Sequence, residues 1–202
     1  MASPQYGTTL RNALLQAYID IIGTAPTLAL RTGAPPANCA AVDAGSLLVS
    51  ITLPSTWMAA PSAGASAMSG TWQGYSAATG TIGHYRITKS GTCHEQGTVT
   101  QAFSLTTSAG TTANSNILTF ASTTGISVGQ AVVGTGIPSG ATVLAVDATT
   151  VSLSAVSSAG VASGTSIYFG DTSGALWSNA VAIATVGTLV VVVKRTLTAP
   201  GA

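Results

Sequence analysis

Apolar residues near the N-terminus recur at intervals of three and four residues, which predicts one amphipathic helix. Its apolar stripe consists of Leu10, Ala13, Leu14, Ala17, Tyr18, Ile21 and Ile22. Thr8 or Thr9 can cap the start, Gly23 provides a left-handed stop, and Pro26 prevents the helix from continuing. The other side carries the polar residues Arg11, Asn12, Gln16 and Asp20. We therefore expect the helix to lie on the surface of another element with this stripe inward.

After the helix the apolar period changes to two, which is typical of strands. Strands are expected at residues 28–30, 47–53, 82–89 and 92–100. The last two are joined by Ser90 and Gly91, so they predict a hairpin. Residues 33–38, which contain two prolines, are expected to form a loop, and residues 59–70 a mobile connection of Ala, Ser, Gly and Pro.

A two-residue turn fixes the register of this hairpin. The expected pairs are Lys89 with Thr92, Thr88 with Cys93, Ile87 with His94 and Arg86 with Glu95. Glu95 is the only glutamate of the chain. We expect it to be a cross-strand partner of Arg86 and not an acid catalyst, because opposite charges across a ladder contribute about 0.2–1 kcal/mol.

From about residue 105 onward the pattern changes to short strands separated by turn residues. Residues 105–115 are expected to be a polar linker. The strands expected after it are residues 117–120, 131–133, 142–146, 151–153 and 166–169. Five short strands in this space predict a small barrel or compact sandwich.

One strong strand, residues 189–193, follows this module and would have no partner in a third domain. We therefore expect residues 105–172 to be an inserted β module, within a first domain of residues 1–104 that is completed by residues 173–202. The fold class is mainly β: an N-terminal helix packed on an antiparallel β-sandwich, with a small inserted β-barrel-like module.

Charged residues make up only 5% of the 202 residues, and the net charge is +1. An ordinary soluble protein carries about 25%. With so few charges, copies of the protein repel one another little. We therefore expect the working state to be an assembly that includes a homo-oligomer. The six basic residues form no stripe, which disfavours nucleic acid as a partner.

The mean hydropathy of +0.49 raises the question of a membrane. The most apolar stretch, residues 180–193, contains Thr185, Gly187 and Thr188. A helix that spans a membrane needs about 20 apolar residues, and this stretch is shorter. We therefore expect a buried strand here, and we expect no membrane partner. Residues 1–7 show no secretory signal pattern. The two cysteines, Cys39 and Cys93, show no disulfide framework, and whether they pair with each other stays open.

Catalytic and metal sites require clustered ligands or acids. The soft metal ligands are Cys39, His84, Cys93 and His94. His84 would lie about 13 Å from Cys93 along the hairpin, too far for one zinc ion, so no metal is expected. The carboxylates are spread singly at Asp20, Asp43, Glu95, Asp147 and Asp171. We therefore nominate no catalytic, cofactor-binding or metal-binding residue and no cofactor, and we expect the protein not to be an enzyme.

Aromatic residues are the remaining candidates for ligand binding. A sugar-stacking platform would draw on Trp57, Trp72, Tyr75, Tyr85, Tyr168, Phe169 and Trp177. Such residues are more often core anchors or interface residues.

Several segments resemble small virion proteins of tailed bacteriophages, namely head decoration, cement and other structural proteins. They are LALRTGAPPANCAAVDAGSLLVSITLPSTWM, SGTWQGYSAATGTIGHYRI and GTCHEQGTV, with the tail TLTAPGA. The likeness covers roughly residues 8–100 and the C-terminal tail. The stretch ILTFASTTGISVGQAVVGTGIPSGATVLAVDATTVSLS is similar in composition to a β module that recurs in phage structural and bacterial surface proteins.

This resemblance implies a virion protein, assembled in the host cytoplasm and located on the capsid surface. Its expected function is that of a capsid decoration or cement protein, whose partners are the major capsid protein and further copies of itself. Residues 105–172 would project outward. The alternative is a tail or fibre component that contacts the host surface or its glycan. A bacterial surface adhesin would need an export signal.

Overall fold

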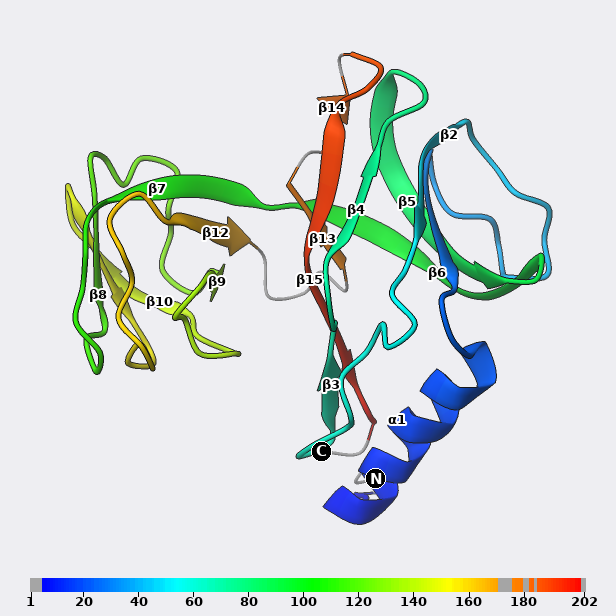
Figure 1. Ribbon diagram of the computed structural model, residues 1–202, viewed down its shortest axis with the longest axis horizontal. Coiled ribbons are helices and arrows are strands. Elements are labelled where there is room, and N and C mark those ends of the chain that lie inside the picture. Colours follow the sequence, from blue (N-terminus) through cyan, green and yellow to red (C-terminus); the bar gives the residue numbers. More distant parts are fainter. Residues whose placement is uncertain (1–4, 171–175, 180–181, 184, 201–202) are drawn as a thin grey trace. The chain divides into compact units, whose positions relative to one another are not determined.

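The computed structural model describes residues 5–170, 176–179, 182–183 and 185–200. The chain forms two compact units. Unit 1 comprises Met1–Val99 and Ala175–Ala202, and unit 2 comprises Thr100–Gly174. The bounds expected for the inserted module lie a few residues inside those of unit 2. The fold is mainly β with one N-terminal helix among the described residues, and this expected fold class is confirmed (Figure 1).

The helix α1 spans Thr8–Ile22. Its N-cap is Gly7, which offers no side-chain cap, so the expected capping by Thr8 or Thr9 is wrong. The helix ends at Gly23 as expected. Gly23 has φ +80°, and its backbone N–H donates to the carbonyl of Ile19 at 2.9 Å.

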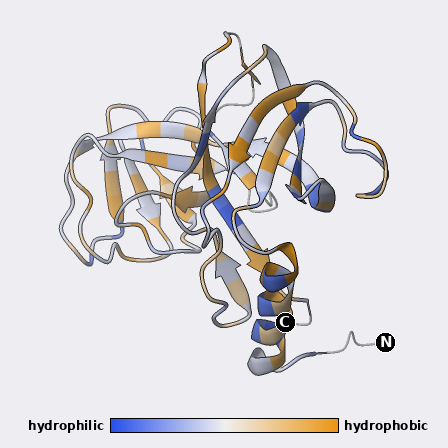
Figure 2. Ribbon diagram, turned by 45° about the vertical axis from the view of Figure 1, so that its right-hand side comes forward, coloured by the Kyte–Doolittle hydropathy of each residue, from blue (hydrophilic) through white to orange (hydrophobic). Residues whose placement is uncertain are grey.

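The buried face of α1 differs from the predicted one. Leu15 and Ile22 are buried, and Tyr18 and Ile19 pack against the core. The large apolar residues of α1 left exposed are Leu10, Leu14 and Ile21. At about 100° per residue, Leu10, Leu14, Ala17 and Ile21 form one stripe and Leu15, Tyr18 and Ile22 another. The predicted stripe combined residues of both stripes, because the sequence of a helix with two apolar stripes does not show which one the fold covers. Figure 2 shows hydrophobic and hydrophilic stretches alternating along the ribbon of α1.

Unit 1 contains a nine-stranded antiparallel sheet. Its main path runs β2-β1-β5-β6-β13-β15-β3, while β14 pairs with β5 and β4 pairs with β15. The strands are β1 Thr27–Thr32, β2 Leu47–Thr52, β3 Ala65–Ala67, β4 Trp72–Tyr75, β5 Gly80–Lys89, β6 Thr92–Gln101, β13 Leu176–Ser178, β14 Ala182–Ile183 and β15 Leu189–Thr198. The C-terminal strand β15 thus lies in the first sheet.

This sheet curls back on itself. Ser76, directly after β4, forms a bridge with Val49 of β2, and the backbone N–H of Ala77 donates to Leu48 at 2.8 Å. Gly74 permits this approach, since a Cβ there would lie 3.0 Å from the Ile51 side chain. The enclosed core contains the large buried side chains Trp57, Trp72 and Tyr85.

Residues 59–70 are not the simple mobile connection that composition predicts. Ala65–Ala67 forms β3 and pairs with Thr196 to Thr198 of β15, and Met58 forms a bridge with Met68. The strands β4 and β13 were also not expected, and the single buried strand expected over residues 180–193 is divided in the described residues into β14 and the start of β15. Small residues such as Ala and Ser have no marked strand preference, so here the neighbouring strand determines the structure.

The β5–β6 hairpin begins in the predicted register and then departs from it. Lys89 pairs with Thr92 and Thr88 with Cys93, as expected. The register then shifts, so that Ile87 faces Glu95 and Arg86 faces Gln96. The predicted pairing of Arg86 with Glu95 is wrong, because a bulge adds one residue to β6. Glu95 consequently shares a face with Ile87 and Tyr85.

Unit 2 is a six-stranded antiparallel sheet in the order β10-β11-β8-β7-β12-β9. The strands are β7 Phe103–Ala109, β8 Ile117–Phe120, β9 Ala131–Val133, β10 Val143–Val146, β11 Thr150–Leu153 and β12 Ser166–Gly170. A bridge between Ala131 and Thr142 joins its two ends, which makes it barrel-like. The linker expected at residues 105–115 is wrong in its first half, because β7 pairs with both β8 and β12.

Candidate functional site

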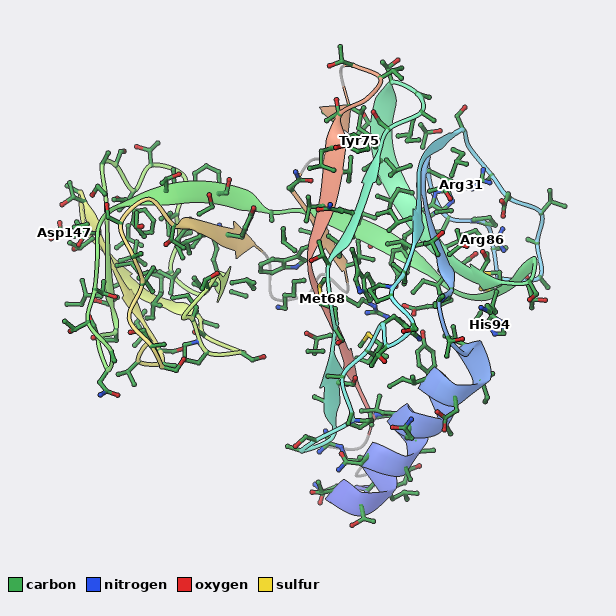
Figure 3. All side chains as sticks on the ribbon, viewed as in Figure 1. Arg31, Met68, Tyr75, Arg86, His94 and Asp147 are labelled. Atoms are coloured by element: carbon green, nitrogen blue, oxygen red, sulfur yellow. A yellow bond between two sulfur atoms is a disulfide. The ribbon has the colours of Figure 1, made fainter. Side chains whose placement is uncertain are left out.

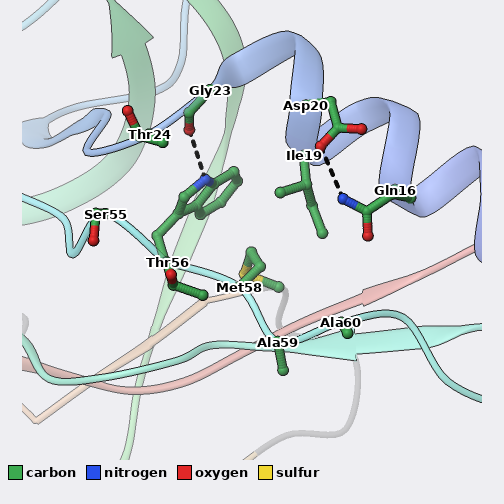
Figure 4. Close-up of a pocket in the computed structure, with 11 residues that line it drawn as sticks. Gln16, Ile19, Asp20, Gly23, Thr24, Ser55, Thr56, Met58, Ala59 and Ala60 are labelled. Atoms are coloured by element: carbon green, nitrogen blue, oxygen red, sulfur yellow. Dashed lines mark hydrogen bonds between the residues drawn. The ribbon is translucent and has the colours of Figure 1, made fainter.

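A pocket of about 400 Å³ lies beside the C-terminal half of α1 (Figure 4). One wall is the helix and its end, and the other is the segment of residues 55–60 that leads away from β2. The lining residues are Gln16, Ile19, Asp20, Gly23, Thr24, Ser55, Thr56, Trp57, Met58, Ala59 and Ala60.

The pocket is held open by a rigid contact at its base. The indole N–H of Trp57 donates to the carbonyl of Gly23 at 3.0 Å, which fixes the end of the helix to the opposite wall. The Trp57 ring is buried between Tyr18 and Trp72, at centroid distances of 6.3 Å and 5.9 Å. Trp57 therefore connects the pocket to the packed core of unit 1.

The electrostatics of the pocket are set by Asp20. Its side chain is exposed in the last turn of α1, where it accepts a hydrogen bond from the neutral amide of Gln16 at 2.8 Å. No basic residue lies in that turn. Since the C-terminal end of a helix carries partial negative charge, an acid there adds to it. Lys89 donates to the carbonyls of Thr24 and Ala25 nearby.

An exposed apolar stripe lies on α1 next to this pocket. Leu10, Leu14 and Ile21 are 50%, 44% and 73% exposed. At about 100° per residue, Asp20 lies between this stripe and the pocket around the helix axis. We call Leu10, Leu14 and Ile21 together with the pocket the docking face. Sequence reasoning did not find it, although an acid in a final helical turn beside a second apolar stripe was a readable signal.

Other charged residues of unit 1 form ion pairs within that unit. Glu95 pairs with Arg195, and the hydroxyls of Tyr18 and Tyr85 donate to its carboxylate. Burial and then the Glu95 charge raise the pKa of Tyr18, so this phenol remains a hydrogen-bond donor. Burial alone would lower the pKa of Arg195, but the charge of the Glu95 carboxylate raises this pKa above its ordinary value. This network joins α1, β5, β6 and β15.

A second group of charges holds residues 33–46, which we call the strap, over β5 and β6. Arg86 donates to the carbonyls of Cys39 at 2.7 Å and Ala41 at 3.2 Å and pairs with Asp43. Asp43 also pairs with Arg31. Figure 3 shows Arg31 and Arg86 pointing toward this loop. Asp43 is therefore a structural ion-pair partner of two arginines.

The strap is also joined covalently to β6. Cys39 and Cys93 form a disulfide, with their Cα atoms 5.2 Å apart, within the usual range for such a bond. The sequence left this pairing open, and the structure shows it. Arg86 and Gln96 bring the strap to the hairpin through hydrogen bonds to Cys39 and Pro36, which places the two sulfurs together.

The remaining metal-ligand candidates lie apart from the docking face. His84 is fully buried, and its Nδ1 lies 3.0 Å from the carbonyl of Gly33. Within the described ranges, no group of three or more His, Cys, Asp or Glu side chains is arranged to hold a metal ion. Asp147 of unit 2 accepts from the backbone N–H of Ala148, and Asp171 lies outside the described residues.

The aromatic residues do not gather into a common surface. Trp57, Trp72, Trp177, Tyr85 and Phe169 are each at most 1% exposed, and Tyr168 is half-buried. Tyr75 on β4 is 70% exposed. Most of these residues are therefore core anchors of their own unit.

Among the described residues, no helix has the length and apolar character needed to cross a membrane. Comparisons with protein-family models, with curated proteins and with solved structures find no match for this chain.

Proposed function

We propose that this chain is a capsid decoration or cement protein of a tailed bacteriophage, which binds the outer surface of the coat shell and stabilises it. The resemblance of residues 28–58, 69–87 and 91–99 to small virion proteins supports the source. The observation that carries the role is the docking face: an apolar helix stripe exposed on unit 1, beside a pocket whose lining carries one charged residue, Asp20.

Binding would rest on burial of neutral surface. Each Å² of apolar area removed from water contributes about 25 cal/mol, less the free energy of ordering the side chains at the interface. Leu10, Leu14 and Ile21 sit on a helix that is already packed in place, so little ordering is required of them. Repetition over many coat subunits allows modest affinity per copy to suffice.

A binding assay on stripped coat shells tests this role. Purified protein is added to shells lacking it, and bound copies are counted by sedimentation. The variant with Leu14→Ser and Ile21→Ser should bind about tenfold or more weakly, because two interface anchors are lost. Leu144→Ser in unit 2 is the control, since Leu144 is 57% exposed and lies outside the docking face.

Wild-type protein that fails to bind shells would contradict the proposal. The copy number in the intact particle separates the shell from the tail. A number comparable to that of coat subunits supports decoration, whereas a far smaller number would place the protein in a tail or fibre that contacts the host.

A further inference from the structure

We propose that the pocket beside α1 receives a basic side chain, a lysine or an arginine, from the coat subunit that covers the apolar stripe. This inference rests on the proposed function and names the chemistry that the docking face recognises.

The pocket suits a side chain with an apolar stem and a charged end. Ile19, Met58 and Ala59 contribute hydrocarbon to its walls, while Gln16 and Asp20 place polar groups at its rim (Figure 4). Lysine and arginine bury their methylene stems against apolar surface and keep the charge at a polar edge. The arrangement of the lining thus matches the order of groups along such a side chain.

Asp20 is the carboxylate of unit 1 that the fold itself leaves without a cation among the described residues. Asp43 pairs with Arg31 and Arg86, and Glu95 pairs with Arg195. Asp20 accepts only from the neutral Gln16 amide in the described structure. In the last helical turn the negative charge of Asp20 lies next to the partial negative charge of the helix end, which is unfavourable for the isolated chain. A cation in the pocket would offset both the acid and the partial charge of the helix end.

The nearby lysine of this chain is already occupied. Lys89 donates to the backbone carbonyls of Thr24 and Ala25. Asp20 borders both the pocket and the apolar stripe. A partner that lies on Leu14 and Ile21 therefore passes within one side-chain length of Asp20, so apolar contact and charge pairing occur on one face.

The first test uses Asp20→Asn in the shell assay at increasing salt. Wild-type affinity should fall with salt by the amount that one charge pair contributes. Asp20→Asn should bind about threefold to tenfold more weakly at low salt and should show a flatter salt dependence. Asp147→Asn, which removes an exposed carboxylate of unit 2, should match wild type.

The second test uses small probes with the isolated protein. n-Butylguanidinium, titrated into ¹⁵N-labelled protein, should shift the amide resonances of residues 16–24 and 55–60. The neutral analogue n-butylurea, of nearly the same shape, should not. Asp20→Asn should abolish the response, and Ala59→Leu, which fills the pocket without changing charge, should abolish it too.

The outcomes separate this inference from the proposed function. Wild-type protein that does not bind shells contradicts the function. Wild-type protein that binds shells, while Asp20→Asn and Ala59→Leu bind equally well with the same salt dependence, overturns the basic side chain and leaves decoration standing. An equal response to n-butylurea likewise overturns it, because recognition would then not depend on charge.

Discussion

Glu95 shows how single residues of this chain connect distant segments. Its carboxylate accepts from Tyr18 on α1 and Tyr85 on β5, and it pairs with Arg195, 100 residues further along. The Arg195 side chain is only 4% exposed, and Glu95 is the carboxylate with which it pairs. A buried pair of this kind contributes little net stability when complete, but its disruption leaves an unpaired charge in the interior.

Glu95→Gln should therefore destabilise unit 1 strongly. The amide keeps the size of the side chain but removes the charge that faces Arg195, and the expected loss is about 3 kcal/mol or more in the free energy of unfolding. Urea unfolding followed by tryptophan fluorescence measures it. Asp147→Asn should change stability by less than about 0.5 kcal/mol. A Glu95→Gln protein as stable as wild type would show that Arg195 has adequate compensation elsewhere.

The sequence did not reveal this role of Glu95, because one extra residue in a strand moves all the following side chains to the opposite face of the sheet. The hairpin turn and its first two pairs were predictable from Ser90 and Gly91. The bulge after Cys93 has no marked local signature, and it moves Glu95 away from Arg86. Asp20 was visible as an acid in a predicted helix, but only the position of residues 55–60 shows that it borders a pocket.

At the scale of elements, strands rich in β-branched residues were predictable and strands of small residues were not. β5 and β15 were expected from alternation and from a run of valines. By contrast, β3 and β7 are built mainly from Ala, Ser and Thr, whose strand preference is weak or depends on context. These two strands form because a neighbouring strand pairs with them. The local sequence pattern carries no information about that partner.

The strap is an element without regular secondary structure, and its position depends on side chains. Breaking the Cys39–Cys93 bond with Cys39→Ser and Cys93→Ser should lower the free energy of unfolding by about 2–4 kcal/mol, since the bond closes a chain separation of 54 residues. Thermal unfolding with and without a reductant measures the change. The double variant should show no response to the reductant. An unchanged wild-type melting temperature on full reduction, verified by thiol labelling, would mean that Arg86 and Asp43 alone hold the strap.

At the scale of the whole molecule, unit 2 is an insertion with its own core. Leu118, Phe120, Ile167 and Phe169 are buried within it. Phe103 and Phe169 face each other across β7 and β12, so the chain enters and leaves unit 2 at neighbouring positions. The small β module was predictable from its turn residues, because Gly and Pro recur between its short strands.

Replacement of residues 105–172 by a short glycine linker should leave unit 1 folded and able to bind coat shells. The docking face lies entirely in unit 1, and the linker has only a short gap to span. Cooperative urea unfolding and shell sedimentation check the two statements separately. A folded deletion variant that no longer binds would mean that the inserted unit takes part in docking.

The bridges that pair parts of the end strands have a consequence for association between copies of the chain. Open strand edges template amyloid-like stacking, and most β proteins guard them with lysines or other charges. This chain has almost no charge available for that purpose. The bridge from Ala131 to Thr142 joins the two ends of the unit 2 sheet, and the bridge from Val49 to Ser76 pairs part of β2 with the segment after β4. Because charges are too few to protect the strand edges, we expect this internal pairing to limit edge-to-edge association.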